Sequence, residues 1–292
     1  MTLPLKEMFR LLPEDPALDG PDFGLYLLTN EGQSLDTLRQ MQHNPLTGQI
    51  GMGVSGFFTL DIAAVRPETE ENKLEGVVLV DCSLRVRHFM RAMIERLKIS
   101  PSRLDMQEFV RSEILSNAKF YYEGALEPAD LIARNYIERF NHSLQDCALG
   151  SPLSTSPHLS SSWLSDETRF EKMKRLATLG NITFLCIDFN QKPVLTKFIS
   201  ILEKRAPLDF AYISNIYLDR LSTFKAVANQ LQTVVGPNTY FIDTERFYPV
   251  DLKNNQRLQQ RKEKPLYSIM ERSCDQMRLF APDGLARFFP KK

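Results

Sequence analysis

Three glycines at a fixed spacing are the residues of this sequence best suited to shaping a binding site. Gly51, Gly53 and Gly56 follow the pattern G-x-G-x-x-G. Glycine is needed in such a pattern where the backbone turns tightly and approaches a ligand without an intervening Cβ atom. A helix beginning near Phe57 would direct the positive end of its dipole at the same place. The spacing predicts a glycine turn facing a nucleotide-type ligand, with Gly51, Gly53 and Ser55 in contact with it; if the preceding strand extends to Met52 or Gly53, the turn is 53–56. The alternative is that these glycines only allow a helix to pack closely on a strand.

Polar residues end the apolar runs that come after these glycines. They are Asp81, Asp188, Ser214, Asn215 and Asp243. Asp81 lies 25 positions after Gly56, near the ~20 positions at which a dinucleotide-binding domain carries an acid for the ribose hydroxyls. A carboxylate there accepts two hydrogen bonds from a vicinal diol. We therefore expect Asp81 to bind the ribose of a nucleoside-type cofactor.

These residues must be positioned by strands and helices that alternate along the chain. Apolar runs predict strands at 48–54, 77–81, 182–188, 209–215 and 239–243. Helical spacing of apolar residues predicts helices at 35–42, 57–65, 84–97, 105–122, 128–147, 166–179, 192–204 and 218–235. This alternation is typical of an α/β fold, a Rossmann-like, mostly parallel sheet covered by helices on both faces. The ligand crevice of such a sheet lies at the carboxyl ends of its strands.

The distance between the second and third strands predicts the domain organisation. Residues 98–165 are more than one crossover needs, and we expect them to form an inserted helical cap that ends in a Ser/Pro-rich loop. The cap belongs to an α/β domain at 46–250. An N-terminal helical and extended segment, 1–45, precedes this domain, and a C-terminal extension, 251–292, packs on it.

Aromatic residues of the expected cap have two possible roles. Trp163, the one tryptophan, is expected to anchor the serine-rich loop, with stacking on a ligand as the alternative. Tyr121, Tyr122 and Phe140 either line a pocket or fill the core.

Composition limits the classes of partner. The 292 residues are 43% apolar, and 36 Lys and Arg balance 36 Asp and Glu, so nucleic acid is an unlikely partner. The basic stretch 253–264 is either a solvated helix or a local contact for phosphate or anionic lipid. No apolar run of about 18 residues predicts a membrane span. Four scattered cysteines and no signal peptide predict a cytoplasmic protein without a metal site, and delivery into another cell stays open.

Four blocks of the sequence resemble a bacterial family of poorly characterised proteins with the class I S-adenosylmethionine methyltransferase fold. The blocks are Ile50–Pro67, Val77–Arg85, Ile182–Asp188 and Phe210–Leu218. The resemblance implies S-adenosylmethionine as the cofactor and methyl transfer to a small-molecule or protein acceptor as the activity.

The same resemblance implies a role for individual residues. Gly51 and Gly53 would hold the amino-acid part of the cofactor, Asp81 the ribose, and Asp188 would lie near adenine. The residues after the fourth strand, Ser214, Asn215 and Tyr217, would face the methyl acceptor, and Ser214 would also contact the cofactor. Asn215 could orient the acceptor and Tyr217 could relay a proton, which makes these two the candidate catalytic residues.

Two alternatives stay open. The acid that commonly precedes the glycine loop is replaced by Gln49 or Ile50, and the segment 214–217 lacks the Asn/Asp-Pro-Pro-aromatic motif of amino-group methyltransferases. These departures favour a non-catalytic interaction protein that keeps the fold. An NAD-dependent oxidoreductase fits the glycine spacing, but a Ser/Tyr-x-x-x-Lys-type proton relay is lacking.

Overall fold

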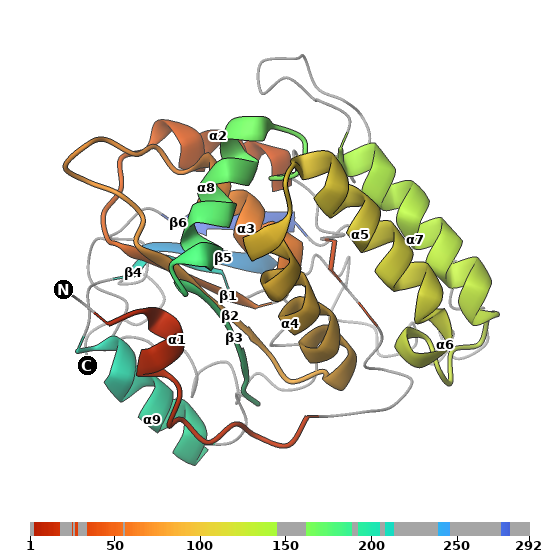
Figure 1. Ribbon diagram of the computed structural model, residues 1–292. Helices are drawn as coiled ribbons and strands as arrows, with labels where there is room; N and C mark the ends of the chain where they lie inside the picture. The colour runs from red at the N-terminus through yellow and green to blue at the C-terminus, as the bar shows by residue number, and fades with distance from the viewer. Residues whose placement is uncertain are drawn as a thin grey trace, which may run out of the picture.

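A computed structural model gives the architecture of the chain (Figure 1). It describes residues 3–17, 25, 27–28, 34–54, 56–144, 162–188, 192–204, 208–212, 239–245 and 276–280.

The core of the molecule is one sheet. Its strands are β1 (Ile50–Val54), β2 (Gly76–Asp81), β3 (Ile182–Cys186), β4 (Leu208–Tyr212), β5 (Tyr240–Glu245) and β6 (Gln276–Phe280). Their order is β3-β2-β1-β4-β5-β6; the first five strands are parallel, and β6 pairs with β5 in the antiparallel direction. The order reverses between β1 and β4, which is the topological switch point of doubly wound α/β proteins.

The strand sequences are apolar because helices cover both faces of the sheet. All five residues of β1, β3 and β4 are buried, as are the first five of β2. Helix α3 (Gly56–Val65) follows β1 and is buried along its whole length. In Figure 1 it lies beside α4 (Leu84–Ile99) and α8 (Glu167–Thr178), while α9 (Lys192–Leu202) lies apart from this group, next to α1 (Leu5–Met8). The right-handed crossovers of parallel strands require this division, because the chain moves in opposite directions across the sheet after β1 and after β3.

Three further helices lie between α4 and α8 in sequence. They are α5 (Arg103–Ser116), α6 (Ala118–Tyr121) and α7 (Ala129–Ser143), and they lie together beside the sheet (Figure 1). Trp163, which follows them, is fully buried. Its ring stacks on Phe170 of α8 and meets Phe57 of α3 edge-on. The prediction that Trp163 is a structural anchor is therefore confirmed.

The N-terminal residues pack on the outer edge of the sheet. Leu5 of α1 is buried against Gly76 of β2, and its N–H donates to Asn181 just before β3. Helix α2 (Ser34–His43) contacts α3 and ends before Pro45 as predicted.

Several helix boundaries follow their capping residues. The Ser83 hydroxyl accepts the Val86 N–H at the start of α4, and the Asp166 carboxylate caps α8 in the same way. Gly180, with φ of 71°, ends α8. The helix predicted at 105–122 is wrong in one respect, because Asn117 interrupts it and separates α5 from α6.

Two predicted strand ends are also wrong. The third strand ends at Cys186, so Asp188 lies two residues beyond it, and β5 continues past Asp243 to Glu245. Strand β6 was not predicted, because its sequence, Gln-Met-Arg-Leu-Phe, alternates polar and apolar residues over only five positions. The helix expected at 218–235 lies outside the described residues.

Candidate functional site at the carboxyl ends of the strands

The first two glycines of the pattern lie inside β1 and not in a turn. A Cβ atom on Gly51 would come within 2.3 Å of the Phe210 ring, and one on Gly53 within 2.3 Å of the Thr59 hydroxyl. Protein side chains therefore use the space that these glycines leave free. β1 extends to Val54, the end of the strand expected at 48–54, so the turn does not begin at Gly51. Only Ser55, which lies outside the described residues, separates β1 from α3.

The parallel register brings Asp81 to the junction of β1 and α3. Val54, the last residue of β1, is paired with Val80, which directly precedes Asp81 at the end of β2. The carboxyl ends of β1 and β2 therefore lie side by side, which is the relative position that a dinucleotide-binding domain gives to its glycine turn and its acid.

The carboxylate of Asp81 is held by the backbone that follows it. One oxygen accepts the N–H of Ser83 at 2.8 Å, and the N–H of Cys82 also interacts with the group. Burial raises the pKa of Asp81 to about 6, while the two N–H groups lower it. At neutral pH Asp81 is therefore an ionised acceptor in a desolvated position.

Asp188 lies next along the same edge, under the N-terminal segment. Its backbone N–H donates to a carboxylate oxygen of Asp15 at 2.8 Å. The N–H of Asp15 in turn donates to the Cys186 carbonyl at 3.0 Å. Burial raises the pKa of Asp15; the hydrogen bond from the Asp188 N–H lowers it, and the negative charge of Asp188 raises it. Within the described residues, no group of three His, Cys, Asp or Glu side chains has a metal-binding arrangement.

Two free cysteines lie between these acids. The Cys186 thiol is 3.9 Å from the Cys82 carbonyl, to which it donates. Burial raises the pKa of Cys82 to about 12 and that of Cys186 to about 11. Both thiols are protonated at neutral pH and are therefore poor nucleophiles.

The amino end of α3 is partly occupied by the chain itself. The N–H of Phe57, in the first turn, donates to the Leu27 carbonyl at 3.1 Å. The N–H groups of Leu27 and Leu28 donate to the Tyr136 hydroxyl of α7 at 2.5 and 2.6 Å. Residues 27 and 28 thus connect the junction of β1 and α3 to α7.

A cavity of about 190 Å³ lies between α4, the α6–α7 connection and α7. Its lining includes Leu25, Arg85, Tyr122, Ile132, Tyr136 and Arg139. Tyr122 therefore lines a pocket, whereas Tyr121 and Phe140 are fully buried in the core.

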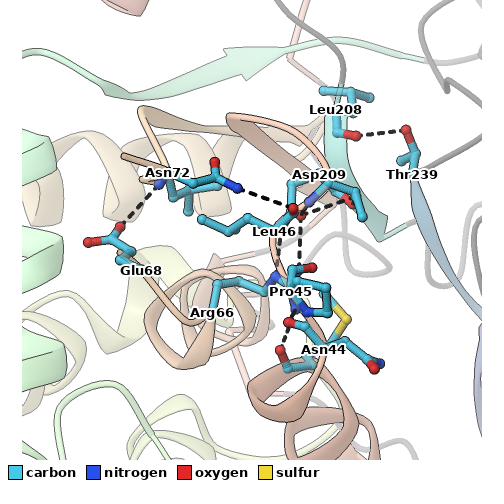
Figure 2. A network of polar contacts seen from close by, with 12 residues as sticks. Asn44, Pro45, Leu46, Arg66, Glu68, Asn72, Leu208, Asp209 and Thr239 are labelled. Carbon is cyan, nitrogen blue, oxygen red and sulfur yellow. Dashed lines mark hydrogen bonds and ion pairs between the residues drawn. The ribbon is translucent and has the colours of Figure 1, made fainter. Parts of the chain in front are cut away.

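The opposite edge of the sheet carries a buried ion pair with a structural role (Figure 2). Arg66, just after α3, forms two hydrogen bonds with Asp209 of β4, at 2.6 and 2.9 Å. Its guanidinium also donates to the carbonyls of Met41, Asn44 and Pro45. Since Asp209 is near the beginning of β4, this network lies at the amino ends of the strands, away from Asp81.

The structure thus brings together only part of the predicted site. Gly51, Gly53 and Asp81 belong to neighbouring strands, and Asp188 lies further along the same edge. Ser55, Ser214, Asn215 and Tyr217 lie outside the described residues.

Sequence reasoning missed Asp15, Leu27, Arg85 and Arg139. The Asp15–Asp188 contact spans 173 positions and left no local signal. Arg85 did leave one: a cation in the first turn of a helix is opposed by the helix dipole, so an arginine there needs a specific reason.

The chain was compared with known proteins. No protein-family model matches it, and no curated protein matches it. Among the described helices, none is long and apolar enough to cross a membrane.

Proposed function

We propose that the chain binds S-adenosylmethionine at the carboxyl ends of β1, β2 and β3 and transfers its methyl group to a small-molecule or protein acceptor. The observation that carries the proposal is the register of β1 and β2, which puts Asp81 beside the β1–α3 junction. Strand β1 borders the topological switch point, because the strand order is β3-β2-β1-β4-β5. When bound, the cofactor supplies a methyl group from a sulfonium centre, which becomes a neutral thioether.

The residues present suit the ribose of this cofactor. The Asp81 carboxylate accepts the backbone N–H groups of Ser83 and Cys82, and no side chain among the described residues donates to it. A vicinal diol would donate to the remaining acceptor positions, and the half-buried Asp81 carboxylate gains more from such bonds than a fully exposed one would.

The last strand favours a single nucleoside over a dinucleotide. A dinucleotide-binding sheet combines two parallel mononucleotide-binding halves. Here β1, β2 and β3 form one such half, but the other is incomplete because β6 runs antiparallel to β5. This supports S-adenosylmethionine over NAD.

A second candidate function is a binding scaffold without catalysis. The Leu27 carbonyl already accepts one of the N–H groups at the amino end of α3, and the space beside Gly51 and Gly53 is filled by Phe210 and Thr59. These two observations favour an interaction protein that keeps the fold.

Calorimetric titration distinguishes these functions. We expect S-adenosylmethionine and S-adenosylhomocysteine to bind, NAD to bind more weakly, and Asp81→Ala to reduce the affinity about 10- to 100-fold through the loss of charge-assisted hydrogen bonds. The matched control is Asp130→Ala, an exposed acid in the first turn of α7. Affinity should also fall as the pH is lowered through about 6, where Asp81 becomes protonated.

Two outcomes would contradict the proposal. Absence of binding by all three ligands would leave the scaffold function. Binding that Asp81→Ala does not weaken would show that the ribose lies elsewhere.

A further inference from the structure

The cavity between α4 and α7 combines an enclosed charge with aromatic walls. Arg85 is 3% exposed, and Tyr122 and Tyr136 are 7% and 6% exposed. All three line the cavity, as does Arg139, which is exposed. The volume, about 190 Å³, is below the ~300–1,000 Å³ of sites for drug-sized ligands. It suits a compact group of about ten non-hydrogen atoms.

The electrostatics of the cavity favour a negative ligand. Arg85 lies in the first turn of α4, so the positive end of that helix dipole adds to its charge. Two acids, Glu123 and Glu127, also line the cavity, but Glu123 is exposed and Glu127 is half-buried. Solvent screens their charges more than it screens that of the buried arginine. Arg85 is therefore the one buried charge among the described residues that line the cavity.

Arg139 adds a second guanidinium. Within the described part of the chain it forms no ion pair or hydrogen bond through its side chain, and Asn135, one turn earlier on α7, also lines the cavity. A planar guanidinium matches the two oxygens of a carboxylate or phosphate. Tyr122, Tyr136 and Ile132 would contact the uncharged part of the same molecule.

The cavity is connected to the proposed cofactor site through its wall. Tyr136 accepts the N–H of Leu27, and the Leu27 carbonyl accepts the N–H of Phe57 in the first turn of α3. Leu27 also lies 3.2 Å from the position of a Cβ atom on Gly56. One residue thus separates the cavity from the junction of β1 and α3.

We propose that this cavity binds a small organic anion, a carboxylate or phosphate carried on a compact apolar or aromatic group. The inference deepens the proposed function by naming its substrate class, and the role of the anion as methyl acceptor rests on that function. The binding of the anion in this cavity is independent of the proposed function.

Ligand-observed NMR titration tests the inference with four probes of similar size. We expect the anions benzoate and phenyl phosphate to bind in the millimolar range, as suits ligands of about ten atoms. The neutral analogue benzamide and the cation benzylamine should bind at least about tenfold more weakly. Whether benzoate or phenyl phosphate binds more tightly identifies the anionic group.

Substitutions of arginines test whether these anions bind in the cavity. Arg139→Gln is expected to weaken benzoate and phenyl phosphate about 10- to 100-fold. Arg134→Gln, an exposed arginine of the same helix outside the cavity, should have no effect. Arg85→Gln should abolish binding. Because Arg85 is buried, circular dichroism is needed to test whether this variant is folded. Because Arg139 is exposed, the Arg139→Gln result does not depend on the folding of Arg85→Gln.

The outcomes separate this inference from the proposed function. Benzoate binding without binding of S-adenosylhomocysteine supports the anion site and contradicts methyl transfer. Binding of S-adenosylhomocysteine without either anion overturns the anion site alone. Equal affinity for benzoate, benzamide and benzylamine, or an Arg139→Gln variant that binds like the wild type, also overturns it.

Discussion

Asp61 is a carboxyl group within a helix whose every residue is buried. The backbone N–H of Trp163 donates to one of its oxygens at 2.6 Å. Burial raises the pKa of Asp61 to about 8, and the Trp163 N–H and the charge of Arg169 only partly offset this effect. Asp61 is therefore protonated in the folded protein near pH 7, while an exposed aspartate in the unfolded chain is ionised. The hydrogen bond from Trp163 to Asp61 holds the residues just before α8 against α3.

The raised pKa of Asp61 predicts how the free energy of unfolding depends on pH. Since the folded-state pKa is raised from 3.8 to about 8, the contribution of this group is fully present below pH ~4 and is lost as the pH rises to about 8. Asp61→Asn keeps an acceptor for the Trp163 N–H but cannot ionise. We expect the free energy of unfolding of Asp61→Asn, relative to wild type, to increase steadily between pH 4 and pH 8, as measured by urea unfolding.

The control for this prediction is Asp130→Asn, an exposed aspartate. Its difference from wild type should be small and nearly constant over the same pH range. A difference between Asp61→Asn and wild type that does not change with pH would show that Asp61 does not titrate in this window.

At the scale of the secondary-structure element, the glycines of β1 determine how closely the neighbouring side chains pack on this strand. A central strand between β2 and β4 has neighbours on both sides, and the Phe210 ring of β4 packs over Gly51. We predict that Gly51→Ala destabilises the ligand-free protein by about 1–3 kcal/mol through overpacking. Adding Phe210→Leu should recover part of this loss. A Gly51→Ala variant of unchanged stability that no longer binds S-adenosylhomocysteine would instead assign Gly51 to the ligand.

The buried ion pair shows how separate elements are joined. Arg66 fastens the connection from α2 to β1 onto β4, because it bonds both the carbonyls of that connection and the carboxylate of Asp209 (Figure 2). Its guanidinium also lies over the Tyr240 ring of β5, 4.9 Å from the centroid. Three parts of the chain thus meet at one side chain.

Removing one partner of this pair should be costly. Arg66→Met would leave the Asp209 charge buried and uncompensated, with an expected loss of about 3–5 kcal/mol in urea unfolding. Arg175→Gln is the matched control, because Arg175 forms a more exposed ion pair with Glu68 and should cost only about 0–1 kcal/mol. Similar losses in the two variants would mean that the buried pair has no special role.

At the scale of the whole molecule, the sequence predicted the layers better than the site. The apolar runs at 77–81 and 182–186 could be recognised because a strand covered on both faces has few alternatives. The glycine pattern left two roles open, because a glycine needed for packing against Phe210 and one needed for a ligand look the same in sequence. The contacts of Asp15 with Asp188, and of Leu27 with Phe57 and Tyr136, depend on tertiary structure alone.

The order of the strands has a consequence for synthesis of the protein. Ile50 of β1 pairs with Gly76 on one side and with Leu208 on the other. At about 5–20 residues per second, a ribosome needs roughly 6 to 26 seconds to proceed from β2 to β4. Throughout that interval β1 has an open, apolar hydrogen-bonding edge, which is the kind of surface that promotes misassociation. The nascent chain of this protein therefore leaves one edge of β1 unpaired until β4 has been synthesised.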